Sequence, residues 1–394
     1  MKVALLSLNY LPSTGGLVSY LKNVAEELVR LGHKVTIFCA MERNSNCQTR
    51  EIINGVEIIR INVLNISLVK KVFTPYIISH KFKKYFIENP LDDFDIVISR
   101  HVYLAYALVG LDAMKKSIFI APLISSKLVS INSNNTKWIE KVYLRLLSPQ
   151  LSKIESTVIK SGMKLGVLSK SKQKEFSVHY GISTPVVLLP GINSERFYPK
   201  HKNDNDIELS DVTIVTVCRL VEEKNISMLI SALSILKQKN KDKNIVLKIV
   251  GDGPLRDELQ KQVKDSGLSN FVDFVGFVTN PEEFYQNSDV FVLPSIYEGF
   301  GHVYIEANAC GIPCIGLSTN IPSVITACDE IIEDNINGFL TYENSDFALA
   351  SAVQRFIDSE LSREEWCNQC VQYVNKKYSW EKHFDNIVNA LNEH

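Results

Sequence analysis

The sequence predicts an α/β protein built from two doubly wound domains with parallel sheets. Short apolar runs of the buried-strand type alternate with helical patterns in both halves of the chain. A polar segment over 199–210 separates the two halves and is typical of a linker. Charge divides there too: residues 1–195 hold 25 Lys and Arg against 14 Asp and Glu, which leaves 18 of the 43 basic and 30 of the 44 acidic residues for the rest. We therefore expect one domain over 1–198 and another over 199–378.

The first half opens with a βαβ unit. A strand pattern at 2–8 is followed by Gly15 and Gly16, by a helical pattern at 17–31 and by a strand pattern at 34–39. A glycine pair at the first turn of such a unit is the expected place for a nucleotide-linked ligand, and a plain tight turn is the alternative. Another strand pattern ends in His101. A histidine at the end of a strand can face a ligand, and a purely structural role is the alternative.

The second half repeats the alternation from 211 onward. Its first strand runs into a loop with Arg219 and Lys224, just before the next helix. Two cations there would neutralise a diphosphate, whereas a solvated pair at a helix start is the alternative. The second strand ends at Gly251-Asp252-Gly253-Pro254, which lacks the third glycine of a dinucleotide fingerprint. A further strand and turn include Phe277 and Val278.

The stretch 294–313 carries two carboxylates, Glu298 and Glu306, with seven residues between them. A buried strand leads into a loop with two glycines, and a helix of about ten residues follows until Gly311 and Pro313 end it. The first amides of a helix attract anions, and a carboxylate can accept hydrogen bonds from sugar hydroxyls. The stretch therefore predicts a site for a phosphorylated sugar. The alternative is an ordinary strand-turn-helix with two solvated acids.

Composition and charge limit the compartment and the partners. The eight cysteines are scattered, which indicates free thiols in a reducing compartment, and we see neither a signal peptide nor a run long enough to span a membrane. A basic first half without a nucleic-acid motif favours an anionic acceptor or an anionic membrane surface over nucleic acid. Residues 68–87 mix cations with aromatic residues, so they could lie on the inner face of a membrane, although Pro75 should interrupt the helix. An ordinary helix face with an apolar underside is the alternative.

These motifs together resemble the Glu-x7-Glu signature of retaining family 4 glycosyltransferases. Pro294-Ser295 stands before the first Glu, Glu306-Ala307-x-Ala309-Cys310-Gly311-x-Pro313 follows, and Arg219-Leu220-x-x-x-Lys224 matches a second family motif. The resemblance implies a GT-B fold, in which the parallel sheets of two Rossmann-like domains face a central cleft. It makes 1–198 the acceptor side and 199–378 the nucleotide-sugar domain, with a last helix at about 379–394 packing back onto the first domain.

The resemblance also implies roles for individual residues. As catalytic residues it gives Glu298, His101, Arg219 and Lys224. As residues that bind the donor it gives Gly15, Gly16, Arg219, Lys224, Gly251, Phe277, Val278, Glu298, Phe300, Gly301, His302, Val303 and Glu306. In this scheme the two cations hold the diphosphate, Glu306 binds the ribose and His101 reaches the sugar. The chain departs from the family at Cys218, where glycine is usual, and at His302, where an apolar residue is usual.

The function that the resemblance implies is retaining transfer of a hexosyl or N-acetylhexosaminyl group. We expect a nucleotide diphosphate sugar as donor, with UDP-sugars ranked before GDP-mannose. A glycan or lipid-linked glycan is the expected acceptor, as in surface polysaccharide or lipopolysaccharide biosynthesis at the cytoplasmic side. We expect neither a cofactor nor a metal, because the histidines are scattered and form no cluster with the spacing of metal ligands. A sugar-nucleotide epimerase and a non-catalytic sugar-nucleotide-binding module remain as alternatives.

Overall fold

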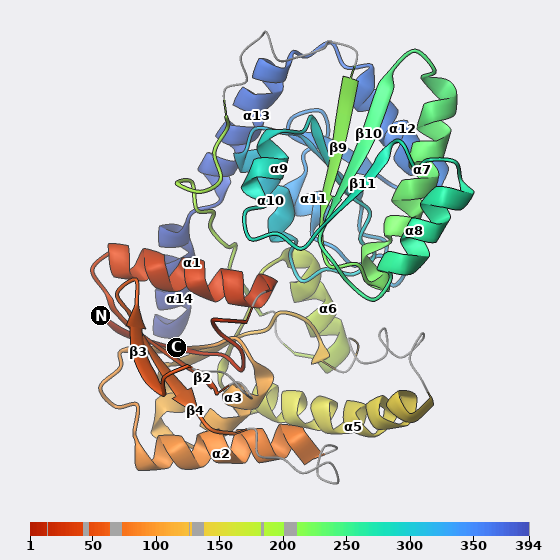
Figure 1. The fold of residues 1–394 in the computed structure, drawn as a ribbon. Helices are drawn as coiled ribbons and strands as arrows, with labels where there is room; N and C mark the ends of the chain where they lie inside the picture. The colour runs from red at the N-terminus through yellow and green to blue at the C-terminus, as the bar shows by residue number, and fades with distance from the viewer. Residues whose placement is uncertain are drawn as a thin grey trace. The chain divides into compact units, whose positions relative to one another are not determined.

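The computed structural model describes residues 1–13, 15–41, 47–63, 73–125, 127, 138–182, 185–200 and 211–393, and for 138–143 and 211 it describes the backbone alone. The chain forms two compact units. Unit 1 comprises Met1–Gly191 together with Trp380–His394, and unit 2 comprises Ile192–Ser379. Each unit is an α/β domain around its own sheet (Figure 1).

Unit 1 contains an eight-stranded sheet in the order β3-β4-β2-β1-β5-β6-β7-β8. Every neighbouring pair is parallel except β3 and β4, which form an antiparallel hairpin that the sequence analysis missed. The strands are β1 (Lys2–Leu6), β2 (Lys34–Ala40), β3 (Arg50–Ile53), β4 (Val56–Ile61), β5 (Ile96–Ser99), β6 (Ser117–Ile120), β7 (Lys164–Val167) and β8 (Val186–Val187). Because the order reverses between β1 and β5, the loops after these two strands meet at one edge of the sheet.

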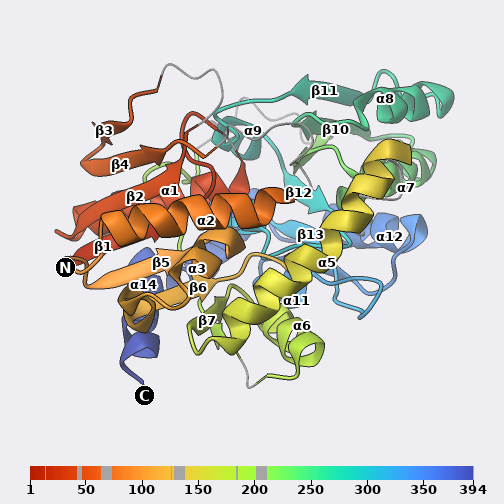
Figure 2. The ribbon, with the colours of Figure 1, turned by 90° about the horizontal axis from the view of Figure 1, so that it is seen from below.

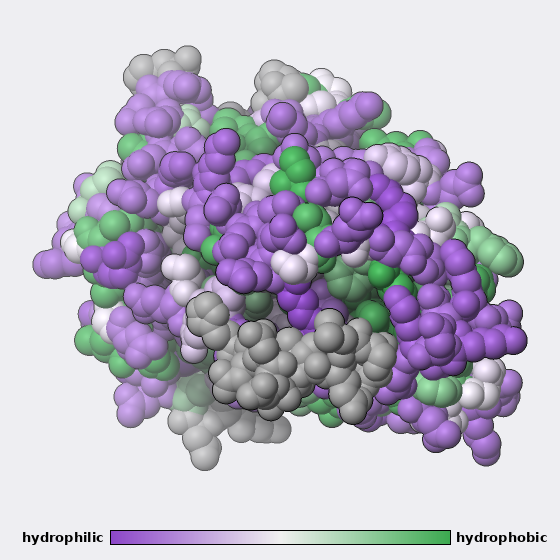
Figure 3. Space-filling model, turned by 90° about the horizontal axis from the view of Figure 1, so that it is seen from above, coloured by the Kyte–Doolittle hydropathy of each residue, from purple (hydrophilic) through white to green (hydrophobic). Residues whose placement is uncertain are grey.

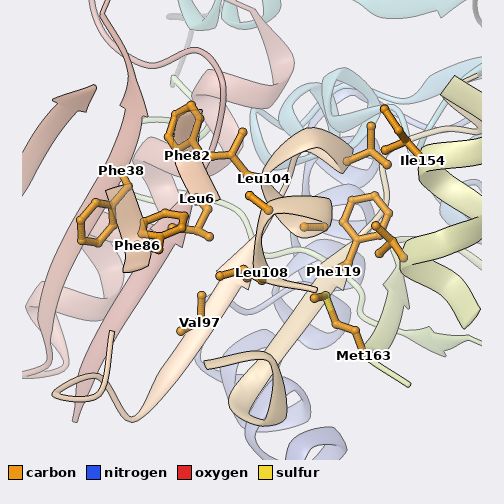
Figure 4. Close-up of a cluster of buried hydrophobic side chains, with 14 of the residues drawn as sticks. Leu6, Phe38, Phe82, Phe86, Val97, Leu104, Leu108, Phe119, Ile154 and Met163 are labelled. Atoms are coloured by element: carbon orange, nitrogen blue, oxygen red, sulfur yellow. The ribbon is translucent and has the colours of Figure 1, made fainter. Parts of the chain in front are cut away.

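Helices cover both faces of this sheet (Figures 1 and 2). They are α1 (Gly16–Arg30), α2 (Thr74–Glu88), α3 (Val102–Leu108), α5 (Trp138–Lys160), α6 (Lys170–Tyr180) and α14 (Trp380–Asn392), with a short 3-10 helix, η2 (Asp112–Lys116). On one face, side chains of the strands pack against α2, α3 and α5, as Phe38 does against Phe86. Figure 4 shows part of this cluster. Such burial of alternate strand residues is what fixes the register of the sheet.

The basic and aromatic pattern of 68–87 is only partly described, since 68–72 lie outside the described residues. Pro75 sits in the first turn of α2, where it suits a helix, so the expected interruption is wrong. Phe82 and Phe86 are buried in the core, and the ammonium groups of Lys81 and Lys83 donate to backbone carbonyls. The described part of α2 therefore fits the alternative interpretation, a helix with an apolar underside.

Unit 2 contains a six-stranded parallel sheet in the order β11-β10-β9-β12-β13-β14. Its strands are β9 (Asp211–Val217), β10 (Asn244–Val250), β11 (Val272–Gly276), β12 (Val290–Leu293), β13 (Cys314–Leu317) and β14 (Gly338–Thr341). This is the Rossmann order 3-2-1-4-5-6, so the reversal lies between β9 and β12. Ligands of such folds bind beside the carboxyl ends of the strands at that point.

The helices of unit 2 also cover both faces of its sheet. They are η4 (Glu222–Lys224), α7 (Ile226–Lys239), α8 (Arg256–Asp265), α9 (Glu282–Gln286), α10 (His302–Ala309), α11 (Cys328–Ile331), α12 (Asp346–Ile357) and α13 (Arg363–Lys377). α7 packs against α8 and α12, and α10 packs against α9 and α13 on the other face (Figure 1). Two parallel, doubly wound sheets confirm the predicted fold class.

The two compact units divide after Gly191, seven residues before the predicted boundary at 198. Residues 192–198, expected in the first domain, belong to unit 2. The Arg196 guanidinium pairs with Glu282 at 2.8 Å, and the ring of Phe197 lies 6.3 Å from that of Tyr285, so this segment is tied to α9. At the other end of the chain, α14 lies within unit 1, where it packs against α1.

None of the helices within the described ranges is long and apolar enough to cross a membrane. The face of the molecule in Figure 3 is largely hydrophilic, with hydrophobic residues in small scattered groups.

Candidate active site

The reversal point of the unit 2 sheet brings two predicted site residues into direct contact. Lys224 lies in the loop after β9, and its ammonium group forms a salt bridge with Glu298 in the loop after β12. The Ser295 hydroxyl donates to the same carboxylate at 3.1 Å, and the Ile296 amide donates to the Glu223 carbonyl at 2.9 Å. The two loops are thus joined by both side chains and backbone, at the edge where a ligand of this fold would lie.

The Lys224–Glu298 pair is largely shielded from water. The side chains are 17% and 13% exposed. Burial alone would lower the pKa of Lys224, but the Glu298 carboxylate outweighs burial and holds the pKa above its usual value. Lys224 therefore carries a full positive charge at neutral pH in a poorly solvated position, where its charge acts strongly on a bound anion.

Arg219 lies at the carboxyl end of β9, and its side chain is exposed. It forms no salt bridge with any described carboxylate, so its guanidinium is available to a ligand. The neighbouring loop after β10 packs against this segment backbone to backbone. A Cβ on Gly251, which has φ +132°, would lie 1.8 Å from the Cys218 carbonyl oxygen. Gly251 is thus required by contact within the chain, whatever a ligand does there.

The loop after β11 lies beside the loop after β10, because the Gly251 amide donates to the Gly276 carbonyl at 2.8 Å. Phe277, the next residue, is 60% exposed, and Val278 is half-buried. A large aromatic side chain exposed at this edge can stack on a planar group such as a nucleobase.

The start of α10 is shaped by Gly301, which caps the helix in the left-handed conformation with φ +98°. A Cβ there would lie 2.8 Å from the Tyr304 ring, so glycine is required. The Phe300 side chain is buried, with its ring 5.9 Å from that of Tyr378, so what Phe300 can offer a ligand is its amide. His302 and Val303 occupy the first turn and are half-buried. These amides make the helix start suitable for anionic or hydroxyl oxygens.

Glu306 has a partner that the sequence analysis missed. The buried Tyr285 of α9 donates its hydroxyl to Oε2 of Glu306 at 3.2 Å. No described residue donates to the other oxygen, Oε1. Burial raises the pKa of Glu306 to about 7, although the Tyr285 hydroxyl and the charge of Arg196 lower it. Tyr285 stands in a short helix without a recognisable motif and between mostly polar neighbours, so nothing in the sequence indicated its burial.

Two predicted site regions of unit 1 also lie at a reversal point. Gly15 and Gly16 follow β1 and begin α1, and His101 follows the neighbouring strand β5. A Cβ on either glycine would meet nothing within 4 Å, so the glycines leave open surface at the first amides of α1. The loop after β1 and the end of β5 are therefore adjacent along one sheet edge.

The protonation of His101 follows from its hydrogen bond. His101 caps α3, and its Nδ1 accepts from the Tyr103 amide at 3.3 Å. Burial lowers the pKa of His101 to about 4, so the ring is neutral at neutral pH. Because Nδ1 accepts, the single ring proton resides on Nε2. His101 is thus arranged to donate a hydrogen bond from Nε2.

The structure thus places Lys224 and Glu298 in a salt bridge, and it leaves Arg219 exposed to solvent. Glu306 accepts a hydrogen bond from Tyr285. Within the described ranges, no three His, Cys, Asp or Glu side chains gather in a group that could hold a metal ion.

Comparison with known proteins identifies the family. Residues 197–377 match the family described as "Glycosyl transferases group 1", and residues 14–196 match the one described as "Glycosyltransferase Family 4". The chain is similar to an uncharacterized glycosyltransferase of Methanocaldococcus jannaschii, with 27% identity over 99% of this chain and 97% of that protein. It is 25% identical, over 78% of this chain and 76% of the relative, to N-acetylgalactosamine-N,N'-diacetylbacillosaminyl-diphospho-undecaprenol 4-alpha-N-acetylgalactosaminyltransferase of Campylobacter jejuni.

A solved structure, Anabaena HepE in complex with UDP and glucose, superposes with a TM-score of 0.70 at 17% identity and covers all of both chains. The two doubly wound units, their order along the chain and these matches lead to one conclusion. The chain belongs to the family 4 glycosyltransferases and is an enzyme of the GT-B fold.

Proposed function

We propose that this glycosyltransferase moves a hexosyl or N-acetylhexosaminyl group from a UDP-sugar to a glycan or lipid-linked glycan, with retention at the anomeric carbon. The Lys224–Glu298 pair at the reversal point of the unit 2 sheet carries the proposal. The structural similarity to HepE, which was solved in complex with UDP and glucose, supports the donor. The relative named for a diphospho-undecaprenol substrate supports the acceptor class. Assembly of surface polysaccharide is the process that this acceptor would serve.

In this proposal unit 2 binds the nucleotide sugar. Lys224 and Arg219 neutralise the diphosphate, and Lys224 stabilises the charge that develops on it as the sugar leaves. Glu298 and the amides at the start of α10 hold hydroxyl groups of the donor sugar. Glu306 accepts hydrogen bonds from the ribose through Oε1, the oxygen that Tyr285 leaves open. Phe277 and Val278 lie beside the base.

We assign to His101 a hydrogen bond from Nε2 to the donor sugar, and to unit 1 the acceptor. The acceptor oxygen bonds to the anomeric carbon on the face from which the diphosphate leaves. The bond from that carbon to the phosphate oxygen breaks, and the proton of the acceptor hydroxyl passes to the same phosphate oxygen. The neutral His101 orients the sugar and holds its own proton throughout. The scheme needs no metal, because the charges of Lys224 and Arg219 meet the leaving diphosphate.

A transfer assay tests the proposal. The enzyme is incubated with UDP-N-acetylglucosamine, UDP-glucose or GDP-mannose and an undecaprenyl-diphosphate-linked sugar, and the anomeric coupling of the product is measured by NMR. Because UDP-sugars of this type carry the α anomer, we expect an α-linked product. A β-linked product contradicts retention. A new sugar isomer formed from the donor alone indicates an epimerase, and binding without turnover indicates a binding module.

A further inference from the structure

Arg100 is a buried cation at the end of β5, next to His101. Its side chain is 2% exposed, and Nη1 donates to the Ile120 carbonyl at the end of β6 at 2.8 Å. The guanidinium carbon lies 4.1 Å from the centre of the Tyr20 ring. Among the described residues no carboxylate forms a salt bridge with Arg100, and its Nε has no hydrogen-bond partner. The guanidinium therefore depends on the Tyr20 ring and on one carbonyl for its stabilisation.

Tyr20 is in turn held by the C-terminal helix. The Tyr20 hydroxyl lies 2.5 Å from Nε2 of His383 in α14, and Nδ1 of His383 lies 2.9 Å from the Leu189 carbonyl. A carbonyl can only accept, so Nδ1 carries the ring proton and Tyr20 donates to Nε2. Burial lowers the pKa of His383 to about 4, which is consistent with a neutral ring. Trp380 adds an edge contact, with its ring 5.4 Å from that of Tyr20.

These contacts lower the stability of the fold more than a purely structural feature needs to. A buried charge without a counter-ion opposes folding, and an apolar side chain of similar length would fill the space without that cost. Arg100 instead fixes the direction of the backbone at the end of β5. Its amide donates to the Leu6 carbonyl of β1 and its side chain to the Ile120 carbonyl of β6, so the exit of β5 is tied to both neighbouring strands.

We propose that α14 positions His101, by holding Tyr20 and through it Arg100, the residue that sets the exit of β5. Arg100, Tyr20 and His383 are positioning residues in this account, and His101 is the residue that meets the sugar. The inference rests on the role of His101 in the proposed function. In this account α14, the helix with which the chain ends in unit 1, contributes to catalysis because it helps to position His101.

Tyr20→Phe tests this link, since it removes the hydroxyl that His383 holds and keeps the ring. We expect kcat for release of UDP from UDP-N-acetylglucosamine to fall about tenfold or more, as small misplacements of a site residue do. KM for this donor should stay within about twofold, because unit 2 carries the nucleotide site. His33→Ala is the matched control: His33 also contacts α14, through Phe384 at 5.1 Å, but stands outside the contacts that lead to Arg100. It should leave kcat unchanged.

A spectroscopic measurement makes the test independent of turnover. In protein with isotope-labelled histidine rings, the His101 signals are identified by their loss in His101→Gln. We expect these signals to shift in Tyr20→Phe and to stay in place in His33→Ala. A lower Tm for Tyr20→Phe with wild-type kcat and unshifted His101 signals would overturn the proposal, and so would a lower kcat without a shift. If wild-type enzyme releases no UDP from any UDP-sugar, the proposed function fails on its own, and the ring signals still decide this inference.

Discussion

Replacing Lys224 by Met removes one charge from the pair at the reversal point of the unit 2 sheet. The methionine side chain fills most of the space of the lysine stem. Among the described residues, the change leaves the poorly solvated Glu298 carboxylate with the Ser295 hydroxyl as its one hydrogen-bond donor. Two effects should follow, one on stability and one on turnover, and they have different physical causes.

The stability effect follows from the unpaired charge. Removal of one partner from a buried pair costs about 3–5 kcal/mol, and because both side chains keep some contact with water we expect the lower end, about 3 kcal/mol. For a domain the size of unit 2, that corresponds to a Tm lower by roughly 6–12 °C. The double variant Lys224→Met/Glu298→Gln leaves no orphan charge, so it should regain about 1–2 kcal/mol of that loss.

The turnover effect follows from the diphosphate. A single electrostatic stabiliser of a leaving group contributes roughly 10²–10³ in turnover, and we expect a loss of that size in Lys224→Met. The double variant should regain stability without regaining turnover, which separates the two effects. UDP release is measured at 25 °C, and the free energy of unfolding by urea titration.

The reasoning would be refuted if Lys224→Met turned over the donor within about threefold of wild type while losing stability. Lys224 would then be a counter-ion of Glu298 alone. Arg219→Met is the matched variant, because Arg219 lies in the same loop but is exposed and outside the pair. It should lower turnover without the loss of stability.

Three further predictions concern unit 2. Because burial raises the pKa of Glu306 to about 7 and its ionised form is the better acceptor for ribose hydroxyls, UDP affinity should rise about tenfold from pH 6 to pH 8 relative to Glu306→Gln. Calorimetric titration of both proteins checks this, and equal pH profiles would contradict it. Tyr285→Phe should raise KM for the donor about twofold to tenfold at nearly constant kcat, since it loses one hydrogen bond to Glu306; a fall in kcat alone would argue against it. Gly301→Ala should cost about 1–3 kcal/mol of stability, because φ is +98° and the new methyl group meets the Tyr304 ring, and urea titration measures the cost.

The fold could be predicted because its signals are local. Buried-type strands alternate with helices in both halves, and the glycine that ends a strand or begins a helix is visible in the sequence. The hairpin of β3 and β4 was missed although its turn, Asn54-Gly55, is a strong hairpin signal. The compact units divide seven residues before the predicted boundary, at a place that the Arg196–Glu282 salt bridge influences, and this bridge joins residues 86 positions apart in the sequence.

The candidate site was predicted as residues, but its contacts were not. Motifs placed Lys224 and Glu298 in two loops, and only the strand order puts these loops side by side. Tyr285 and His383 belong to no sequence motif. Their importance comes from hydrogen-bond partners that are distant in the sequence, Glu306 and Tyr20. Arg100 reads as an ordinary strand end in the sequence, whereas the structure buries it against Tyr20. Local sequence patterns do not reveal contacts between side chains that are far apart in the sequence.

The central claim is that the unit 2 reversal point binds the nucleotide diphosphate of the donor. A crystal structure of the enzyme with UDP tests it most directly. The account predicts phosphate oxygens within hydrogen-bond distance of Nζ of Lys224 and ribose hydroxyls on Oε1 of Glu306. UDP bound elsewhere, with the Lys224–Glu298 pair untouched and Glu306 facing no ribose, would contradict it.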